Sequence, residues 1–235
     1  MANGRLSSGV GGLDELIGGG FLEGSNILVT GDPGTGKSIL GLQFISNGAA
    51  NGERGIYLTV EEEENKLASQ AKQFGWDLEG LEKEKKVVVN VIEEFDIEEI
   101  LDQLEKEVKD IKAKRLVVDS LSMMSIFTRV MDPVSKGKKK TNLLHPGGYE
   151  LTRSQVVGIL KRLSELGTTN LIISEGQEIS DKIAQFAADG VVGLGINEAI
   201  GTRSLTIVKM RETKHPLGKM NTQIGDKGLE IIAKK

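Results

Sequence analysis

Short apolar runs recur along the chain, and segments with helical periodicity separate most of them. An apolar run of about five residues bounded by polar residues or glycine is typical of a strand buried on both faces. Such runs predict strands at 26–30, 55–60, 87–92, 115–120 and 170–174. Further runs follow one another over short turns, which favours antiparallel strands. These later runs lie at 191–194, 203–210, 221–224 and 229–232.

The segments between the earlier runs predict helices. Residues 39–45 begin an apolar helix, and a second helix runs through Leu67 and stops at Gly75. Capping boxes, in which Asp or Thr is followed three residues later by Glu or Gln, start two further helices at Asp96 and Thr152. Because strands and helices alternate, the chain is predicted to be an α/β protein. Its central sheet is expected to be mainly parallel and flanked by helices, with antiparallel strands at the C-terminal end.

The segment between the first strand and the first helix has the P-loop pattern G-x-x-x-x-G-K-[ST]. Its glycines let backbone N–H groups turn inward around an anion. Lys37 is expected to reach the outer phosphates of ATP, and the Ser38 hydroxyl to ligate Mg²⁺. A strand before the loop and a helix after it are the context that this motif requires, which favours a nucleotide site over a glycine-rich turn. The predicted nucleotide-binding residues are Gly31, Asp32, Pro33, Gly34, Thr35, Gly36, Lys37, Ser38 and Ile39.

A second predicted strand ends in an acidic residue, Asp119, at the same edge of the sheet as the P-loop. Asp119 ends the apolar run 115–120, as a Walker B acid does, and ligands bind at the carboxyl ends of parallel strands. Asp119 is therefore expected to hold Mg²⁺, directly or through a water. An Asp that merely caps a buried strand is the alternative, and the P-loop favours the metal role.

Two glutamates follow the strand at 55–60. Glu61 or Glu62 lies where a carboxylate can orient or deprotonate the water that attacks a γ-phosphate. Acidic residues also favour the first turn of a helix, so a solvated helix start is the alternative. The pattern does not choose between the two residues.

Two cations occur late in the chain. Lys209 and Arg211 are two residues apart on a predicted strand, so their side chains share one face. On an edge strand that faces a neighbouring subunit they can act as a cationic finger in trans. An ordinary charged edge strand, which resists aggregation, is the alternative.

Residues 127–150 interrupt the alternation of strands and helices. This segment is expected to be an exposed, flexible insertion. It contains a lysine-rich run that either contacts the backbone of DNA or RNA or is a solvated loop. No aromatic residues interleave it, which weakens a model of stacking on single strands. The lysines concerned are Lys136, Lys138, Lys139 and Lys140.

Composition narrows the class of protein. The 235 residues include no cysteine and two histidines, which excludes disulfides and argues against zinc. No apolar run approaches the ~20 residues of a membrane span, and the N-terminus lacks a signal-peptide core, so a cytoplasmic protein is expected. The net charge of −4 argues against a globally basic nucleic-acid binder. No Pro- or Ser-rich linker divides residues 1–235, which predicts a single domain.

Several ordered segments resemble the KaiC-like branch of the RecA superfamily of ATPases. The opening segment 5–20, RLSSGVGGLDELIGGG, is similar to the lead-in of that family. Segment 57–62, YLTVEE, resembles its strand with paired catalytic glutamates, and 74–78, FGWDL, matches a further signature. Segment 209–211, KMR, is similar to the one that supplies Lys and Arg fingers in trans. The resemblance extends from about residue 5 to residue 232.

The resemblance implies Mg²⁺-dependent, slow ATP hydrolysis at the subunit interfaces of a ring or filament, with a hexameric ring favoured. It implies that Glu61, Glu62, Lys37, Lys209 and Arg211 are catalytic. A regulatory ATPase that acts on a protein partner through conformational change is the leading hypothesis. The lysine run falls after the Walker B strand, where RecA-type recombinases carry a DNA-binding loop. A RecA-paralogue type of ATPase in recombination or repair that binds single-stranded DNA is therefore an alternative, and a nucleotide-binding scaffold with negligible catalysis is another.

Overall fold

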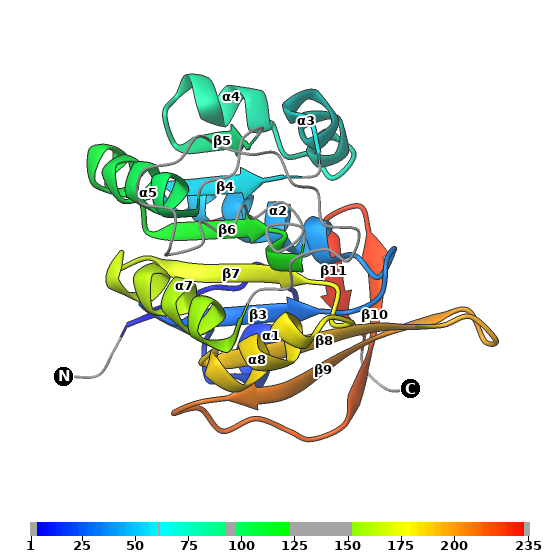
Figure 1. The fold of residues 1–235 in the computed structure, drawn as a ribbon. Coiled ribbons are helices and arrows are strands. Elements are labelled where there is room, and N and C mark those ends of the chain that lie inside the picture. The colour runs from blue at the N-terminus through cyan, green and yellow to red at the C-terminus, as the bar shows by residue number, and fades with distance from the viewer. Residues whose placement is uncertain (1–3, 61, 93–96, 123–151, 233–235) are drawn as a thin grey trace, which may run out of the picture.

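The structure is a computed structural model, and it describes residues 4–60, 62–92, 97–122 and 152–232 (Figure 1). Nine strands form the main sheet of this part of the chain, in the order β11-β10-β9-β8-β3-β7-β6-β4-β5. The six strands from β8 to β5 in this order are parallel, and β9, β10 and β11 extend the sheet with antiparallel pairings. The strands are β3 (Asn26–Thr30), β4 (Gly55–Thr59), β5 (Val87–Val91), β6 (Arg115–Asp119), β7 (Thr169–Ser174), β8 (Gly190–Asn197), β9 (Thr202–Met210), β10 (Lys219–Gly225) and β11 (Gly228–Ile231).

Helices cover both faces of the sheet (Figure 1). One hydrophobic cluster joins the sheet to α1, α2, α3 and α4, and a second cluster joins it to α5, α7 and α8. A small sheet of β1 (Arg5–Leu6) and β2 (Phe21–Leu22) precedes the main one. The helices are α1 (Leu13–Leu16), α2 (Lys37–Ala50), α3 (Glu64–Lys72), α4 (Leu78–Lys83), α5 (Ile97–Ile111), α7 (Arg153–Glu165) and α8 (Ile179–Ala187).

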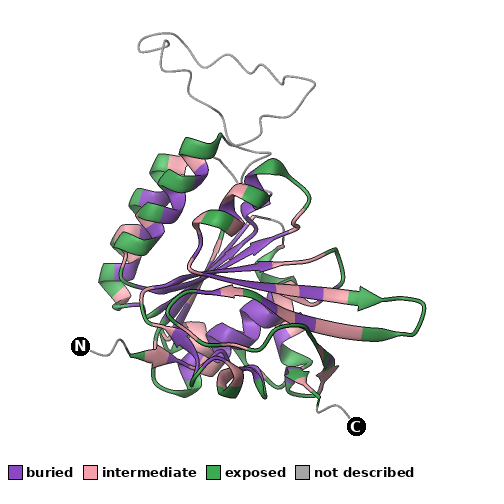
Figure 2. Ribbon diagram, turned by 90° about the horizontal axis from the view of Figure 1, so that it is seen from below, coloured by how far each residue is buried: buried purple, intermediate pink, exposed green. Residues whose placement is uncertain are grey.

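Burial explains why the central strands are apolar throughout. Every residue of β4, β6 and β7 is buried, because helices cover both faces. Figure 2 shows this as buried strands at the centre of the molecule, with exposed residues on the outer sides of the helices. α5 has the opposite pattern, with a buried stripe of Ile100, Leu101, Leu104 and Val108 and a polar outer face.

The predicted fold class and all nine predicted strands are confirmed, with ends that differ by a few residues. The capping box of α7 is also confirmed, because the Thr152 side chain accepts from Gln155 N–H and Gln155 accepts from Thr152 N–H. Asp96 lies outside the described residues. The sequence patterns do not predict α8, the short helices α1 and α4 or the pair β1–β2. α8 is only nine residues long, which is short for a helical period to be recognised, and its Ile179 and Phe186 are exposed.

The strand register gathers the predicted site at one edge of the sheet. Thr59 of β4 pairs with Asp119 of β6, and Thr30 of β3 pairs with Ser174 of β7. The carboxyl ends of these four strands therefore lie side by side, and the P-loop follows β3 directly. No helix in the described part of the chain is long and apolar enough to cross a membrane.

Candidate nucleotide-binding site

The P-loop connects the end of β3 to the first turn of α2. Gly34 and Gly36 have φ of 79° and 101°, a left-handed conformation that L side chains rarely adopt. α2 begins at Lys37, so the positive end of its dipole points at the loop. Lys37 Nζ donates to the carbonyl oxygens of Gly31 at 2.8 Å and Asp32 at 3.2 Å. The ammonium group thus lies over the loop, as the predicted phosphate-binding role requires.

Side chains from other elements hold the loop in shape. Thr35 Oγ1 donates to Asp32 O at 2.8 Å within the loop. Gln177 Nε2, after β7, lies 3.4 Å from Asp32 Oδ1. Arg203 Nη1, on β9, donates to Gly34 O at 2.7 Å. The sequence analysis missed Gln177 and Arg203, because each is more than a hundred residues from the loop and neither belongs to a local motif.

The predicted metal ligands Ser38 and Asp119 meet at the hydroxyl of a buried tyrosine. Tyr57, in the middle of β4, donates from its hydroxyl to Asp119 Oδ2 at 2.7 Å. The Ser38 side chain lies close enough to the same hydroxyl to lower the pKa of Tyr57. Asp119 is 5% exposed and Tyr57 is fully buried. The structure therefore brings Ser38 and Asp119, which are 81 positions apart in the sequence (119 − 38), to one point beneath the P-loop.

This environment raises the pKa of Tyr57 well above 10.0. Burial is the largest cause, because removing the phenolate from water disfavours its charged form. The carboxylate of Asp119 and the negative charge of Glu62 raise the pKa further, and the hydrogen bond with Ser38 opposes them. Tyr57 is therefore a neutral hydrogen-bond donor at physiological pH.

Of the two candidate bases, Glu62 is described and Glu61 lies outside the described residues. The Glu62 backbone N–H donates to Thr59 Oγ1 at 3.2 Å, which holds the chain near the end of β4. The negative charge of Glu62 is one of the causes that raise the pKa of Tyr57. α3 begins at Glu64, so the helix starts after this pair.

Lys209 and Arg211 lie away from this site, toward the amino ends of the parallel strands. Lys209 of β9 pairs with Val191 of β8, and Val191 in turn pairs with Leu28 in the middle of β3. Lys209 is therefore level with the middle of β3. Arg211 follows β9, and its backbone N–H donates to Asp189 O, just before β8 begins. The two cations are therefore displaced toward the amino ends of the parallel strands, away from the P-loop at the carboxyl ends.

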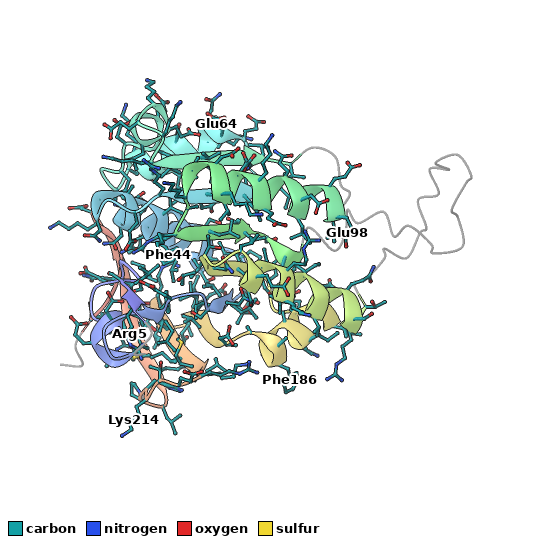
Figure 3. The ribbon with its side chains drawn as sticks, turned by 90° about the vertical axis from the view of Figure 1, so that its left-hand side faces the viewer. Arg5, Phe44, Glu64, Glu98, Phe186 and Lys214 are labelled. Atoms are coloured by element: carbon teal, nitrogen blue, oxygen red, sulfur yellow. The ribbon has the colours of Figure 1, made fainter. Side chains whose placement is uncertain are left out.

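Both cations bind the last carbonyl groups of α8. Lys209 Nζ donates to Gln185 O at 2.8 Å and Phe186 O at 3.1 Å. Arg211 donates to Phe186 O at 3.2 Å and pairs with Asp189 Oδ1 at 3.2 Å. Burial, followed by the neighbouring charge of Arg211, lowers the pKa of Lys209, and Asp189 opposes this. Phe186 lies on the outside of the molecule in Figure 3 and is 81% exposed.

β10 pairs with residues 203–206 in the first half of β9, so that half is interior to the sheet. Lys209 and Arg211 lie beyond this pairing, so the expectation that they lie on an edge facing a neighbouring subunit stays a prediction. The β10–β11 hairpin then packs on α2, where a Cβ added to Gly36 would lie 3.1 Å from Ile224. The shared face of Lys209 and Arg211 is confirmed by their common contact with Phe186 O. The lysines at 136 and 138–140 lie outside the described residues.

The donor set fits Mg²⁺ bound together with a nucleotide. Mg²⁺ prefers oxygen ligands and is usually held by one or two protein oxygens plus substrate phosphates. The Ser38 hydroxyl and the Asp119 carboxylate supply such oxygens, and their common contact with Tyr57 brings them together below the loop. The site thus matches the P-loop class of nucleotide-binding proteins.

Comparisons with known proteins agree with this class. The family model described as ATPase: KaiC matches residues 6–235. A UPF0273 protein of Aeropyrum pernix is 30% identical, with 98% of this chain and 94% of the relative covered. The circadian clock oscillator protein KaiC of Synechococcus elongatus is 31% identical, with 98% of this chain and 43% of that protein covered. A crystal structure of a KaiC-like protein from Pyrococcus horikoshii OT3 superposes with a TM-score of 0.82 and is 33% identical, covering 98% of this chain and 100% of its own.

The chain therefore belongs to the KaiC family of ATPases within the RecA superfamily. Membership in a family of ATPases implies that the P-loop binds a nucleotide. It also agrees with the resemblance drawn from the opening segment and the KMR segment of the sequence.

Proposed function

We propose that this protein is a Mg²⁺-dependent ATPase that hydrolyses ATP at the subunit interfaces of an oligomer, with a hexameric ring as the favoured assembly. The observation that carries the proposal is the separation of two half-sites in one chain. Ser38 and Asp119 lie at the Tyr57 hydroxyl beside the P-loop, and Glu62 follows the same strand, β4. Lys209 and Arg211 extend to the end of α8, away from the P-loop.

In this proposal the P-loop amides and Lys37 bind the β- and γ-phosphates and neutralise charge on them. Ser38 and Asp119 would hold Mg²⁺, directly or through water, and the metal would supply positive charge that stabilises the phosphates. Glu61 or Glu62 orients the attacking water and accepts its proton. The water oxygen bonds to the γ-phosphorus while the bond from that phosphorus to the β–γ bridging oxygen breaks, which leaves ADP and phosphate.

Charge that develops on the γ-phosphoryl group needs a cation in addition to Lys37. Lys209 and Arg211 of the same chain lie toward the amino ends of the parallel strands, away from the P-loop at the carboxyl ends, so they do not supply it. A neighbouring copy whose amino-end surface faces this P-loop can supply both. This requirement makes assembly part of the active site, and it allows one subunit's conformation to affect its neighbour's turnover. We infer that the assembly regulates a protein partner through this conformational cycle.

ATP turnover measured together with molecular mass in solution tests the proposal. Wild-type protein is expected to release phosphate with Mg²⁺ and to form a larger particle when ATP is added. Lys37→Ala is expected to lose nucleotide affinity by about tenfold or more, because a charge-assisted contact contributes about 1.5–3 kcal/mol. Glu61→Gln or Glu62→Gln is expected to keep ATP binding and to lose turnover. Lys72→Ala, an exposed lysine on α3, is the matched control.

Turnover that is equal in wild type and in all three variants would refute hydrolysis at this site. Tight ATP binding without phosphate release would favour a nucleotide-binding scaffold. The same mass measurement repeated with single-stranded DNA at low salt detects the alternative function, since a DNA-coated filament differs in size from a ring.

A further inference from the structure

The tyrosine beneath the P-loop occupies a position that ordinary core packing does not explain. Tyr57 lies in the middle of β4, with its ring against the first turns of α2. Gly41 makes room for the ring, because a Cβ at that position would lie 3.2 Å from Tyr57 Cε2. A phenylalanine would fill the same space. The hydroxyl is therefore the part of the side chain that needs an explanation.

The hydroxyl connects the two elements that carry the predicted metal ligands. Its single proton is donated to Asp119 Oδ2 at 2.7 Å, at the end of β6. Its lone pairs are then available to Ser38, at the start of α2. A phenol has one donor and two acceptor positions, so the Tyr57 hydroxyl that donates to Asp119 can still accept a hydrogen bond from Ser38. The hydrogen bond to Tyr57 constrains the orientation of the Asp119 carboxylate.

We propose that Tyr57 is a positioning residue that holds Ser38 and Asp119 at the spacing required to bind Mg²⁺ on a bound nucleotide. This inference rests on the Mg²⁺ dependence in the proposed function. Partners that hydrogen-bond a metal-binding carboxylate fix its orientation, and their loss typically weakens metal affinity by about 10–100-fold. The phosphate cradle is expected to be formed by backbone N–H groups and Lys37, whereas the Tyr57 hydroxyl contacts Ser38 and Asp119.

Tyr57→Phe removes the hydroxyl and keeps the ring. The experiment measures binding of a fluorescent ADP analogue, first in EDTA and then during titration with MgCl₂. We expect the affinity in EDTA to stay within about twofold of wild type and the Mg²⁺ concentration at half-effect to rise about tenfold. Ile56→Val trims a buried methyl group from the neighbouring residue of β4 and controls for lost stability. It is expected to leave the Mg²⁺ titration unchanged.

A double-mutant cycle with Asp119→Asn tests whether Tyr57 affects Mg²⁺ binding through the Asp119 carboxylate. If Tyr57 acts through Asp119, adding Tyr57→Phe to Asp119→Asn changes the Mg²⁺ titration little, because the oriented carboxylate is already absent. Additive effects would overturn the inference. So would a Tyr57→Phe titration equal to wild type, or an equal loss of affinity in EDTA and in Mg²⁺.

Failure of the proposed function is distinguishable from failure of this inference. If Mg²⁺ has no effect on nucleotide binding by the wild-type protein, the proposed metal role and the inference are both overturned. If wild type responds to Mg²⁺ and Tyr57→Phe responds identically, the metal role stands and the inference alone is wrong. Thermal unfolding of each variant confirms that folded proteins are compared.

Discussion

The side-chain amide of Gln43 hydrogen-bonds both backbone groups of Leu229. Gln43 Oε1 accepts from Leu229 N–H at 2.8 Å, and Nε2 donates to Leu229 O at 3.0 Å. The same Nε2 donates to Gly9 O at 2.7 Å. Gln43 is on α2, less than two turns after the P-loop, and is 5% exposed. One side chain therefore connects the N-terminal segment and the last strand to α2, the helix that follows the P-loop.

Gln43→Met is expected to destabilise the fold. Methionine has a similar volume but leaves the buried backbone groups of Leu229 without their partner. Each unsatisfied buried group costs about 1–3 kcal/mol, so the free energy of unfolding is expected to fall by at least about 2 kcal/mol. Urea unfolding followed by circular dichroism measures this. Gln73→Met, an exposed glutamine after α3, is the control, and an equal loss in both variants would contradict the argument.

A second anchor of α2 is a buried ion pair. Arg115 is 1% exposed, and its Nε pairs with Glu53 Oε2. Its Nη1 donates to Ser7 O and Phe44 O at 2.8 Å each, and the guanidinium lies 4.4 Å from the centre of the Phe44 ring. Burial lowers the pKa of Arg115, and Glu53 opposes this. The carboxylate therefore compensates a buried cation.

Glu53→Gln is expected to leave that cation unpaired. Removing one partner of a buried ion pair typically costs 3–5 kcal/mol, and we expect the lower end, about 3 kcal/mol, because the Glu53 side chain is 24% exposed. Glu84→Gln breaks an exposed pair with Lys86 and should change stability by less than about 1 kcal/mol. Urea unfolding of both variants makes the comparison. Similar losses of unfolding free energy in the two variants would show that the burial of Arg115 does not determine the cost of breaking its ion pair.

Mixed assemblies test the finger role of Arg211. Lys37→Ala removes the nucleotide site but keeps the cations, whereas Arg211→Ala keeps the nucleotide site. If the cation acts in trans, each variant alone is inactive, and mixing them restores part of the ATP turnover at shared interfaces. Phosphate release as a function of mixing ratio is the measurement. Lys182→Ala, an exposed lysine on α8, is the control for Arg211→Ala. Restored activity is absent if Arg211 acts in its own subunit or only stabilises α8.

The sequence predicts the elements whose signals are local. The central strands are apolar because both faces are covered, and the P-loop has its spacing within eight residues, so both were predictable. Tyr57 was not, because its partner Asp119 is 62 residues away and nothing near Tyr57 marks its hydroxyl as polar. Arg203 is similar, since only the pairing of β9 with β8 brings it to Gly34. The interior position of the first half of β9 also depended on pairing, which composition alone does not determine.

α8 was missed for a related reason. Ile179 and Phe186 are exposed, although their spacing places them on one face of the helix, so the large apolar residues do not mark the face that is buried. Its N-terminal capping box uses Glu178 and Asp181 in place of the Ser or Thr usually sought. Its C-terminal carbonyls are satisfied by Lys209 and Arg211. Tertiary contacts therefore define this helix at its C-terminal end.

Glu82 is expected to make stability depend on pH. It lies on α4 and accepts from Val89 N–H at 3.1 Å, and burial raises its pKa above 4.5, with Glu64 and Glu79 adding to the effect. The folded protein therefore holds this proton to higher pH than the unfolded chain does. The contribution to stability is complete below pH 4.5 and falls as pH rises through 4.5 toward the raised value.

Glu82→Gln removes this charge and keeps an oxygen acceptor for Val89. The variant is therefore expected to gain stability over wild type as pH rises from 4 to 7, and to show the smallest difference at the acid end. Thermal unfolding across this pH range measures the difference. Glu198→Gln, at an exposed position after β8, is the control, and its thermal stability should depend on pH in the same way as that of the wild type. A difference for Glu82→Gln that is constant with pH would mean that packing, and not the desolvated carboxylate, causes the change.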